Sequence, residues 1–289
     1  ATTEIYTLSL HDALPICNKV NHRKVTFKNR YGITLAADLY EPKNIESKVP
    51  AIAVSGPFGA VKEQSSGLYA QTMAERGFLT LAFDPSYTGE SGGEPRNVAS
   101  PDINTEDFSA AVDFLIAHPN VDAKRIGIIG ICGFGGMGLN AAAMDTRIKA
   151  TVASTMYDMS RVNANGYFDA EDSAEVRRNK REAMNAIRTR DAQNGTATPG
   201  TPGLPTSIKG DEPQFVKDYF DYYKTERAFH ARAINSNGAW NPTMALSFIN
   251  MPLLTYIHEI DNAAKQFNAG YLPVQVFTCT ASSVFQLTC

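Results

Sequence analysis

The stretch Arg125-Ile126-Gly127-Ile128-Ile129-Gly130-Ile131-Cys132-Gly133-Phe134-Gly135-Gly136-Met137-Gly138 changes character abruptly at its cysteine. Before Cys132 it is rich in isoleucine, a β-branched residue that favours a buried strand. After Cys132 come closely spaced glycines and then an alanine-rich stretch, which indicate a turn that opens a helix. A strand that ends at a nucleophilic side chain and turns directly into a helix is typical of a nucleophile elbow, where glycines let backbone and substrate approach closely. The sequence therefore predicts that Cys132 lies at the tip of such a turn.

Length and charge limit the classes of protein to which the chain can belong. It has 289 residues, of which 43% are hydrophobic, enough for one large α/β domain or for a domain with an inserted cap. The formal net charge is −3, and charges of both signs are mixed along the chain. Such a surface offers no basic patch for a polyanion or an anionic membrane, so we expect neither nucleic acid nor a membrane as a partner.

The four cysteines are scattered, at positions 17, 132, 279 and 289. They predict no disulfide framework and no zinc site, and they fit a reducing cytoplasm. No apolar stretch reaches the length of about 18 residues that a membrane span needs, and the first residues lack the features of a secretory signal. We therefore predict a cytoplasmic protein without a metal or other cofactor.

The pattern upstream and downstream of the elbow alternates between strands and helices. Residues 24–28 and 33–39 alternate in polarity around a turn at 29–32, which predicts an antiparallel hairpin. Strands are then expected at 51–54, 78–83, around Ile126 and at 148–154. Helices are expected at 69–76, from near Asn104, and through residues 141–143. Alternation at these lengths predicts a mostly parallel central sheet with helices on both faces.

Composition divides the chain into four parts. Residues 1–18 are predicted to be an artefactual or disordered extension, because positions 7–16 match one reading frame of a common sequencing adapter. Residues 19–156 are the predicted core, and 157–250, which show no clear strand pattern, are a predicted helical cap. Residues 251–289 are predicted to be an incomplete return to the core with an out-of-frame tail, since 261–289 contain no His, Glu or Arg.

The predicted cap carries aromatic residues for which two interpretations stay open. They could wall a substrate pocket, although aromatics at helical spacing are more often ordinary core. The residues in question are Phe215, Tyr219, Phe220, Tyr222, Tyr223 and Trp240.

From about residue 19 to 260 the chain resembles the α/β-hydrolase superfamily, in the branch of dienelactone-hydrolase-like and Xaa-Pro-dipeptidyl-peptidase-like enzymes that carry Cys at the elbow. The resemblance lies in Ser55-Gly56-Pro57-Phe58-Gly59 after the third strand, in residues 84–93 after the fourth, and in Asn120-Val121-Asp122 before Arg125-Ile126-Gly127. It implies the α/β-hydrolase fold and hydrolysis of ester, lactone or related acyl bonds of a small-molecule substrate. One departure is Phe134, which stands where the elbow pattern has a small residue.

The chemistry of such a site assigns roles to four residues. A thiol at a helix N-terminus meets oriented N–H groups, which are expected to lower its pKa and make Cys132 a nucleophile. The resemblance implies that backbone N–H groups of Gly133 and of Phe58 or Gly59 stabilise the oxyanion. Pro57 is excluded because it has no N–H. The other interpretation of Cys132 is a small buried side chain that fills a tight turn.

A triad would also need an acid and a histidine after the nucleophile. Only His230 and His258 follow Cys132, and neither stands where the resemblance expects the base. His258 is predicted to lie on a helix surface. The base and acid are thus unassigned, and we expect the chain to have little or no activity.

Two other functions remain open from the residues. Gly133, Gly135 and Gly138 form a G-x-G-x-x-G pattern between a strand and a helix, as in dinucleotide-binding proteins. A non-catalytic protein that binds acyl compounds is the other alternative. The sequence does not predict the oligomeric state.

Overall fold

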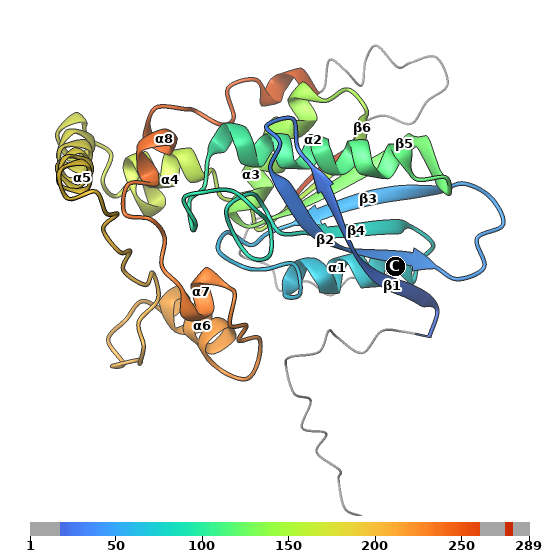
Figure 1. Cartoon of the computed structure of the whole chain (residues 1–289), viewed down its shortest axis with the longest axis horizontal. Coiled ribbons are helices and arrows are strands. Elements are labelled where there is room, and N and C mark those ends of the chain that lie inside the picture. The colour runs from blue at the N-terminus through green and yellow to red at the C-terminus, as the bar shows by residue number, and fades with distance from the viewer. Residues whose placement is uncertain (1–17, 261–274, 280–289) are drawn as a thin grey trace, which may run out of the picture.

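A seven-stranded sheet forms the centre of the structure, a computed structural model that describes residues 18–260 and 275–279 (Figure 1). The strand order is β1-β2-β4-β3-β5-β6-β7. β1 and β2 are antiparallel to their neighbours, and the strands from β4 to β7 are parallel. The strands are β1 (Val20–Lys28), β2 (Thr34–Pro42), β3 (Val49–Ser55), β4 (Leu79–Phe83), β5 (Val121–Ile131), β6 (Ile148–Ser154) and β7 (Gln275–Cys279). The predicted mostly parallel sheet is confirmed.

The edge hairpin is closed by the side chain of Asn29. Its Oδ1 accepts hydrogen bonds from the backbone N–H of Tyr31, at 3.1 Å, and of Ile33, at 3.0 Å. Gly32 completes the turn with a φ of 80°, which glycine adopts without strain. The turn sets the register that pairs Lys28 with Thr34, and the predicted hairpin is confirmed.

Helices cover both faces of the sheet, as predicted. α1 (Ser65–Ala74) lies on one face, whereas α2 (Pro101–Ala117) and α3 (Gly133–Met144) pack side by side on the other (Figure 1). The larger apolar cluster lies under α2 and α3 and includes Phe83, Phe108 and Phe134. The smaller one lies under α1 and includes Ile52 and Ala70.

One predicted boundary is corrected by a capping interaction. α2 begins at Pro101 rather than near Asn104. Ser100 caps the helix, since its side chain accepts a hydrogen bond from the Ile103 N–H at 3.4 Å. Proline is favoured at the first helical position because it has no N–H to leave unpaired there.

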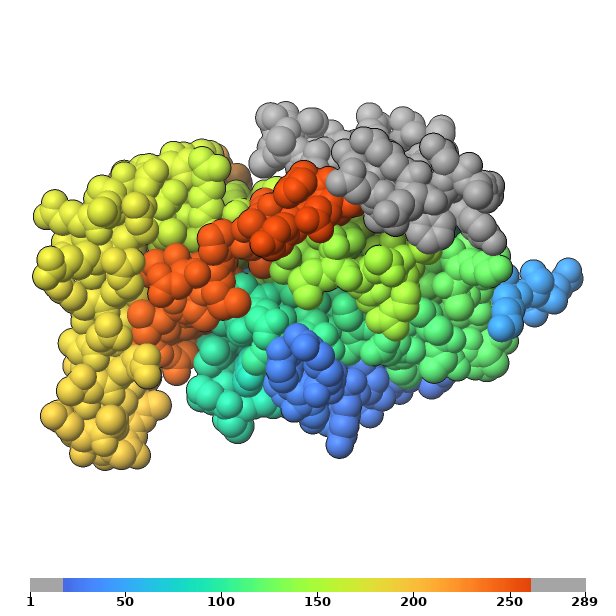
Figure 2. Space-filling view, turned by 90° about the horizontal axis from the view of Figure 1, so that it is seen from above, coloured from blue at the N-terminus to red at the C-terminus, as the bar shows by residue number. Residues whose placement is uncertain are grey.

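Between β6 and residue 260 the described chain contains helices and loops but no strand. The helices are α4 (Met159–Asn165), η1 (Tyr167–Asp169), α5 (Ala174–Asn194), α6 (Gln214–Lys224), α7 (Ile234–Asn237), α8 (Ala245–Ile249) and η2 (Ile257–Glu259). The helices from α4 to α8 gather beyond one end of the sheet, and the yellow part that contains α5 projects outward in Figure 2, whereas η2 packs on α3. Contacts from Tyr157 to Cys132 and from Asn235 to Gly59 identify this end as the carboxyl end of β5 and β3.

The division of the chain into an extension, core, cap and tail stays a prediction. Residues 1–17, 261–274 and 280–289, on which the predicted foreign extension and out-of-frame tail fall, lie outside the described residues. Within the predicted tail, the backbone of β7 pairs with β6 and extends the sheet.

A buried lysine joins the loops that follow β3 and β4. The Lys62 side chain is 0% exposed, and its Nζ lies 2.6 Å from carboxylate oxygens of both Glu63 and Glu90. It also lies 3.6 Å from Asp84 Oδ2. Asp84 in turn accepts hydrogen bonds from the Lys62 N–H at 2.7 Å and from the Glu90 N–H at 2.8 Å. Backbone and side-chain bonds thus fix both loops to one another.

The charges in this network depend on each other. Burial alone would lower the pKa of Lys62, but the charges of Asp84 and Glu63 raise it above its ordinary value. Burial raises the pKa of Asp84 to about 6, against the lowering effect of Lys62. Lys62 is therefore a buried cation, and its removal would leave the buried carboxylate of Asp84 without its counter-charge.

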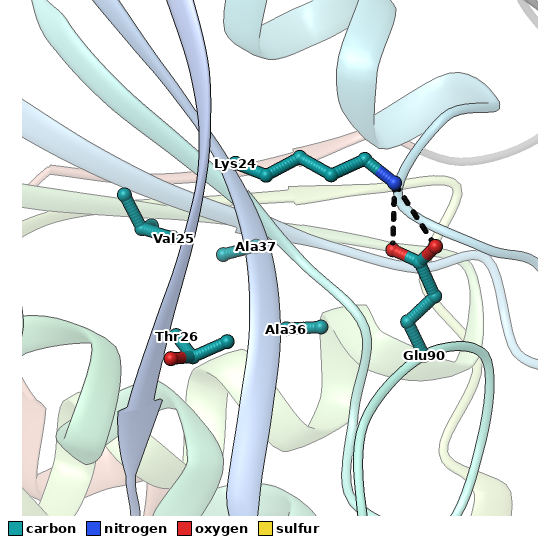
Figure 3. Close-up of a pocket in the computed structure, with 6 residues that line it drawn as sticks. All are labelled: Lys24, Val25, Thr26, Ala36, Ala37 and Glu90. Carbon is teal, nitrogen blue, oxygen red and sulfur yellow. Dashed lines mark hydrogen bonds and ion pairs between the residues drawn. The ribbon is translucent and has the colours of Figure 1, made fainter.

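We expect Lys62→Met to lower the free energy of unfolding by about 3–5 kcal/mol, because loss of one partner of a buried ion pair leaves the other charge buried and unpaired. The matched control is Lys24→Met. Lys24 contacts both carboxylate oxygens of Glu90, at 2.9 and 3.0 Å (Figure 3), but its side chain is 61% exposed. Loss of that exposed pair should cost at most about 1 kcal/mol. Urea unfolding of both variants measures the difference, and equal losses would contradict the role of Lys62.

Candidate functional site

The strand-to-helix turn at Cys132 has the backbone of a tight elbow. β5 ends at Ile131, and Cys132 caps α3 with φ 57° and ψ −125°, a conformation that side chains rarely adopt. A Cβ atom at Gly130 would lie 2.2 Å from the backbone oxygen of Phe134, so only glycine fits there. The predicted turn is present, and it projects Cys132 at the carboxyl end of β5.

Phe134 does not prevent this turn, although it departs from the expected pattern. Its side chain is 1% exposed and points into the core rather than toward the site. The ring centroid lies 6.2 Å from that of Phe58 and 6.4 Å from that of Phe108. The elbow therefore needs small residues at Gly130 and Gly133, and a large ring is accommodated at 134.

The loop after β3 meets the elbow at the point where the sheet order reverses. The chain leaves β3 for β4 on one side and later crosses to β5 on the other, an arrangement that opens a crevice at the carboxyl ends of the strands. The backbone N–H groups of Phe58 and Gly133 both donate to the sulfur of Cys132. The structure thus brings together three of the four predicted site residues around one atom.

Gly59, the fourth, lies one residue further along the same loop. Its carbonyl accepts a hydrogen bond from the Asn235 N–H at 3.0 Å. Within the described part of the chain, Phe58 rather than Gly59 supplies the hydrogen bond from this loop to Cys132. Of the two alternatives that the sequence left open, Phe58 is the donor aimed at the sulfur.

The pKa of the Cys132 thiol is displaced opposite to the expected direction. Burial raises the pKa, and this effect outweighs the hydrogen bonds from Gly133 and Phe58 that lower it. The expectation of a lowered pKa was therefore wrong. The helix N-terminus does act on the thiol, but the sequence pattern did not reveal how much of the sulfur the surrounding chain covers.

Three tyrosines lie near the thiol of Cys132, and two of them, Tyr219 and Tyr223, were predicted from the sequence. Burial and the nearby Cys132 charge raise the pKa of Tyr223 and Tyr167; for Tyr219 a hydrogen bond with Tyr157 adds to burial. Tyr157 also donates its backbone N–H to the carbonyl of Cys132 at 3.1 Å. Tyr219 and Tyr223 are thus near enough to Cys132 for its charge to affect their pKa, and their role in a pocket stays a prediction.

The remaining predicted aromatics are divided between the site and its surroundings. Trp240 stacks on Phe58, with ring centroids 4.3 Å apart, and so supports the loop after β3. The hydroxyl of Tyr222 lies 3.0 Å from that of Ser65, at the start of α1. Phe215 packs on Tyr219. Tyr157 and Tyr167 were missed, although the position of Tyr157 just after β6 was a signal that it would lie at the same edge.

In the described ranges no histidine forms a hydrogen bond with Cys132. The described histidines contact other residues instead. His22 lies 3.1 Å from Asp38, and His118 lies 3.4 Å from Glu41. His230 neighbours Glu63 and Arg232, and His258 is exposed beside Tyr256. The expectation that His258 lies on a helix surface is confirmed, since it belongs to the 3-10 helix η2.

The glycines of the dinucleotide pattern face protein rather than open space. A Cβ at Gly133 would lie 2.7 Å from Met159 Cγ, and one at Gly135 would lie 2.9 Å from Met156 Cγ. The chain after β6 therefore occupies the space that a pyrophosphate would need at the start of α3. This packing argues against the dinucleotide-binding alternative.

Residues 18–260 and 275–279 can also be assessed for a metal site and for a membrane span. They contain no cluster of three or more His, Cys, Asp or Glu side chains arranged to hold a metal ion. Nor does any helix in these ranges combine the length and apolar character needed to cross a membrane.

The pKa of Cys132 leads to a direct test. In a Cys17→Ala, Cys279→Ala, Cys289→Ala variant, Cys132 is the only thiol. Because its pKa is raised and the thiolate is the reactive form, we expect the iodoacetamide alkylation rate to have its midpoint at a higher pH in the folded protein than in the same variant unfolded in urea. A midpoint at or below that of the unfolded chain would contradict the dominance of burial.

Comparison with known proteins identifies relatives over most of the chain. The family model of the X-Pro dipeptidyl-peptidase (S15 family) matches residues 31–247. The protein PA2218 of Pseudomonas aeruginosa is 64% identical over 247 residues, which are 85% of this chain but 66% of the relative, just under two thirds of its length. YcjY of Escherichia coli is 38% identical over 218 residues, 73% of this chain and 70% of that protein.

Solved structures also match this chain over most of its length. The crystal structure of PA2218 matches with a TM-score of 0.84 and 54% identity over 96% of this chain and 90% of that chain. The α/β hydrolase GrgF from Penicillium shares the fold, with a TM-score of 0.68 and 19% identity over 90% of each chain. Over a shorter range, the thiohydrolase aneE of Aspergillus aculeatus is 33% identical over 132 residues, 46% of this chain and 41% of that protein.

Proposed function

The chain belongs to the X-Pro dipeptidyl-peptidase (S15) family of α/β hydrolases, and on that premise we propose that Cys132 is the nucleophile in the cleavage of small acyl compounds. The bonds cleaved in this proposal are esters, lactones or thioesters. The observation that carries it is the meeting of two backbone N–H groups, of Phe58 and Gly133, at the sulfur of a strained elbow. The related thiohydrolase supports the inclusion of thioesters.

In the proposed reaction the Cys132 thiolate attacks the carbonyl carbon of the substrate. A carbon–sulfur bond forms, and the carbonyl oxygen takes up the negative charge. The N–H groups of Phe58 and Gly133 donate to this oxyanion, and each such donor is worth about 10²–10³ in rate. Collapse of the intermediate expels the alkoxide or thiolate, which takes a proton from water and leaves an acyl group on Cys132. Attack by water then releases the acid and restores the thiol.

The surroundings of Cys132 suggest that the second half of this reaction is slow. A general base contributes about 10²–10⁴ in rate, and the described histidines lie elsewhere. The nearby tyrosines have raised pKa values, so they stay protonated and cannot accept the proton of the attacking water. The proposal therefore includes low turnover, with the acyl-enzyme accumulating before it is hydrolysed.

We expect p-nitrophenyl acetate to give a burst of p-nitrophenol followed by slow turnover, because acylation precedes a poorly assisted hydrolysis. Intact-mass spectrometry should find one acetyl group, located by peptide mapping at Cys132. Cys132→Ala should abolish both burst and label. The Cys17→Ala, Cys279→Ala, Cys289→Ala variant, which keeps only Cys132, should retain them.

The same experiment separates catalysis from the alternative of a non-catalytic acyl-binding protein. That alternative is favoured by the raised pKa of Cys132, which keeps most of the thiol protonated near neutral pH. If the protein binds p-nitrophenyl acetate without becoming acylated, and Cys132→Ala behaves as the parent does, the nucleophile proposal is contradicted. The binding function would then remain.

A further inference from the structure

Asn235, at the start of α7, holds the loop that carries the proposed oxyanion donor. Its side-chain Nδ2 donates to the carbonyl of Phe58 at 2.8 Å, and its backbone N–H donates to the carbonyl of Gly59 at 3.0 Å. Two consecutive carbonyls of the loop are therefore bound by one residue that is distant in the sequence. Neither carbonyl can then rotate toward the sulfur of Cys132.

The fit between Asn235 and the loop is close. Gly59 has a φ of 83°, and a Cβ atom there would lie 2.4 Å from Oδ1 of Asn235. Both the backbone conformation and the space exclude a side chain at position 59. The glycine that the sequence singled out as a possible donor is thus required so that Asn235 can approach.

Other contacts fix the same segment to the same loop. The ring of Phe58 stacks on Trp240. Gln64 donates its side-chain amide to the carbonyl of Ala228 at 2.6 Å. Arg232 pairs with Glu63. Residues 228–240 therefore pack along the loop after β3, with Asn235 as their contact to the backbone of Phe58.

The Asn235 side chain also reaches toward the nucleophile. It hydrogen-bonds the hydroxyl of Tyr223, whose pKa is raised first by burial and then by the charge of Cys132. Tyr223 is 5% exposed, so this hydrogen bond lies inside the protein. One amide thus connects the loop after β3 with a buried tyrosine that lies near Cys132.

We propose that Asn235 is a positioning residue that keeps the Phe58 N–H directed at the oxyanion by holding the carbonyls of Phe58 and Gly59 from behind. This inference rests on the proposed function and adds to it the residue that preorganises the donor. A donor that is already oriented needs no rearrangement when charge develops, which is the source of its effect on rate.

The first test is Asn235→Ala with p-nitrophenyl acetate as the probe. The expected result is a fall of about 10- to 100-fold in the kcat of acylation, less than or equal to the loss of a whole donor, with an unchanged KM. The matched control is Asn237→Ala, since Asn237 is exposed on the same helix and should keep the parental rate. A kcat for Asn235→Ala equal to that of Asn237→Ala would overturn the proposal.

A second variant tests the need for a donor at position 235. In Asn235→Asp the carboxylate can only accept, so it repels the carbonyl of Phe58, whereas the protonated acid can donate to it. The ratio of the variant's kcat to the parental kcat should therefore rise as the pH falls through the pKa of the introduced acid. A ratio that does not change with pH would overturn the proposal, and this readout remains decisive if the alanine variant does not fold.

A third measurement does not depend on turnover. Because the Phe58 N–H lowers the pKa of Cys132, loss of Asn235 should move the pH midpoint of iodoacetamide alkylation upward in the single-thiol variant. An unchanged midpoint would overturn the role of Asn235 even if Cys132 is acylated. If the parent is not acylated at all, the proposed function fails, and the shift of the midpoint alone decides whether Asn235 orients Phe58.

Discussion

The parallel pairing of β3 with β5 determines where the candidate site is built. In this ladder Ser55 lies opposite Gly130, so both strands end at the same level. The chain then leaves β3 toward Phe58 and leaves β5 toward Cys132, and the two exits lie next to one another. A shift of the register by one residue would separate them and would also exchange the faces of β5. The N–H groups that meet at the sulfur therefore depend first on this strand pair.

Enclosure of Cys132 has opposing effects on its chemistry. Helices after β6 bring Tyr167, Tyr219 and Tyr223 near Cys132 and cover part of it, so that its thiol is only partly open to water. Removal of water raises the pKa of the thiol, but it also strengthens the electrostatic interaction of the N–H donors with a developing oxyanion. The contacts that the helices after β6 make with Cys132, rather than the residues of the elbow, determine the balance between these two effects.

The sheet and the position of the elbow could be predicted because their signals are local. The isoleucines before Cys132 and the glycines after it specify a strand and a turn within a few residues. Phe58 was predicted through its place after a buried strand. The start of α2 has local signals too, since Ser100 caps the helix and Pro101 occupies its first position, whereas the acidic residues after Asn104 lie further inside it.

The rest depended on contacts between distant parts of the chain. Nothing in the residues around Asn235 marks it as a partner of Phe58, because an asparagine before a glycine-containing loop is common in turns. The sign of the pKa displacement of Cys132 follows from how deeply the tertiary structure buries it. The orientation of Phe134 likewise depends on the space between Phe58 and Phe108, and that space cannot be inferred from the residues of the elbow.

The separation of Asn235 from Phe58 along the chain also affects the order in which the site is assembled during folding. The elbow is bonded to nearby segments, through the hydrogen bonds of Cys132 with Ser154 and Tyr157, whereas the loop after β3 requires residues 228–240. Contacts between distant residues carry a larger loop-closure entropy and form later on average. By this general tendency, we expect the turn at Cys132 to form before Asn235 fixes the loop that carries Phe58, so that the surroundings of the thiol are completed only when residues 228–240 dock.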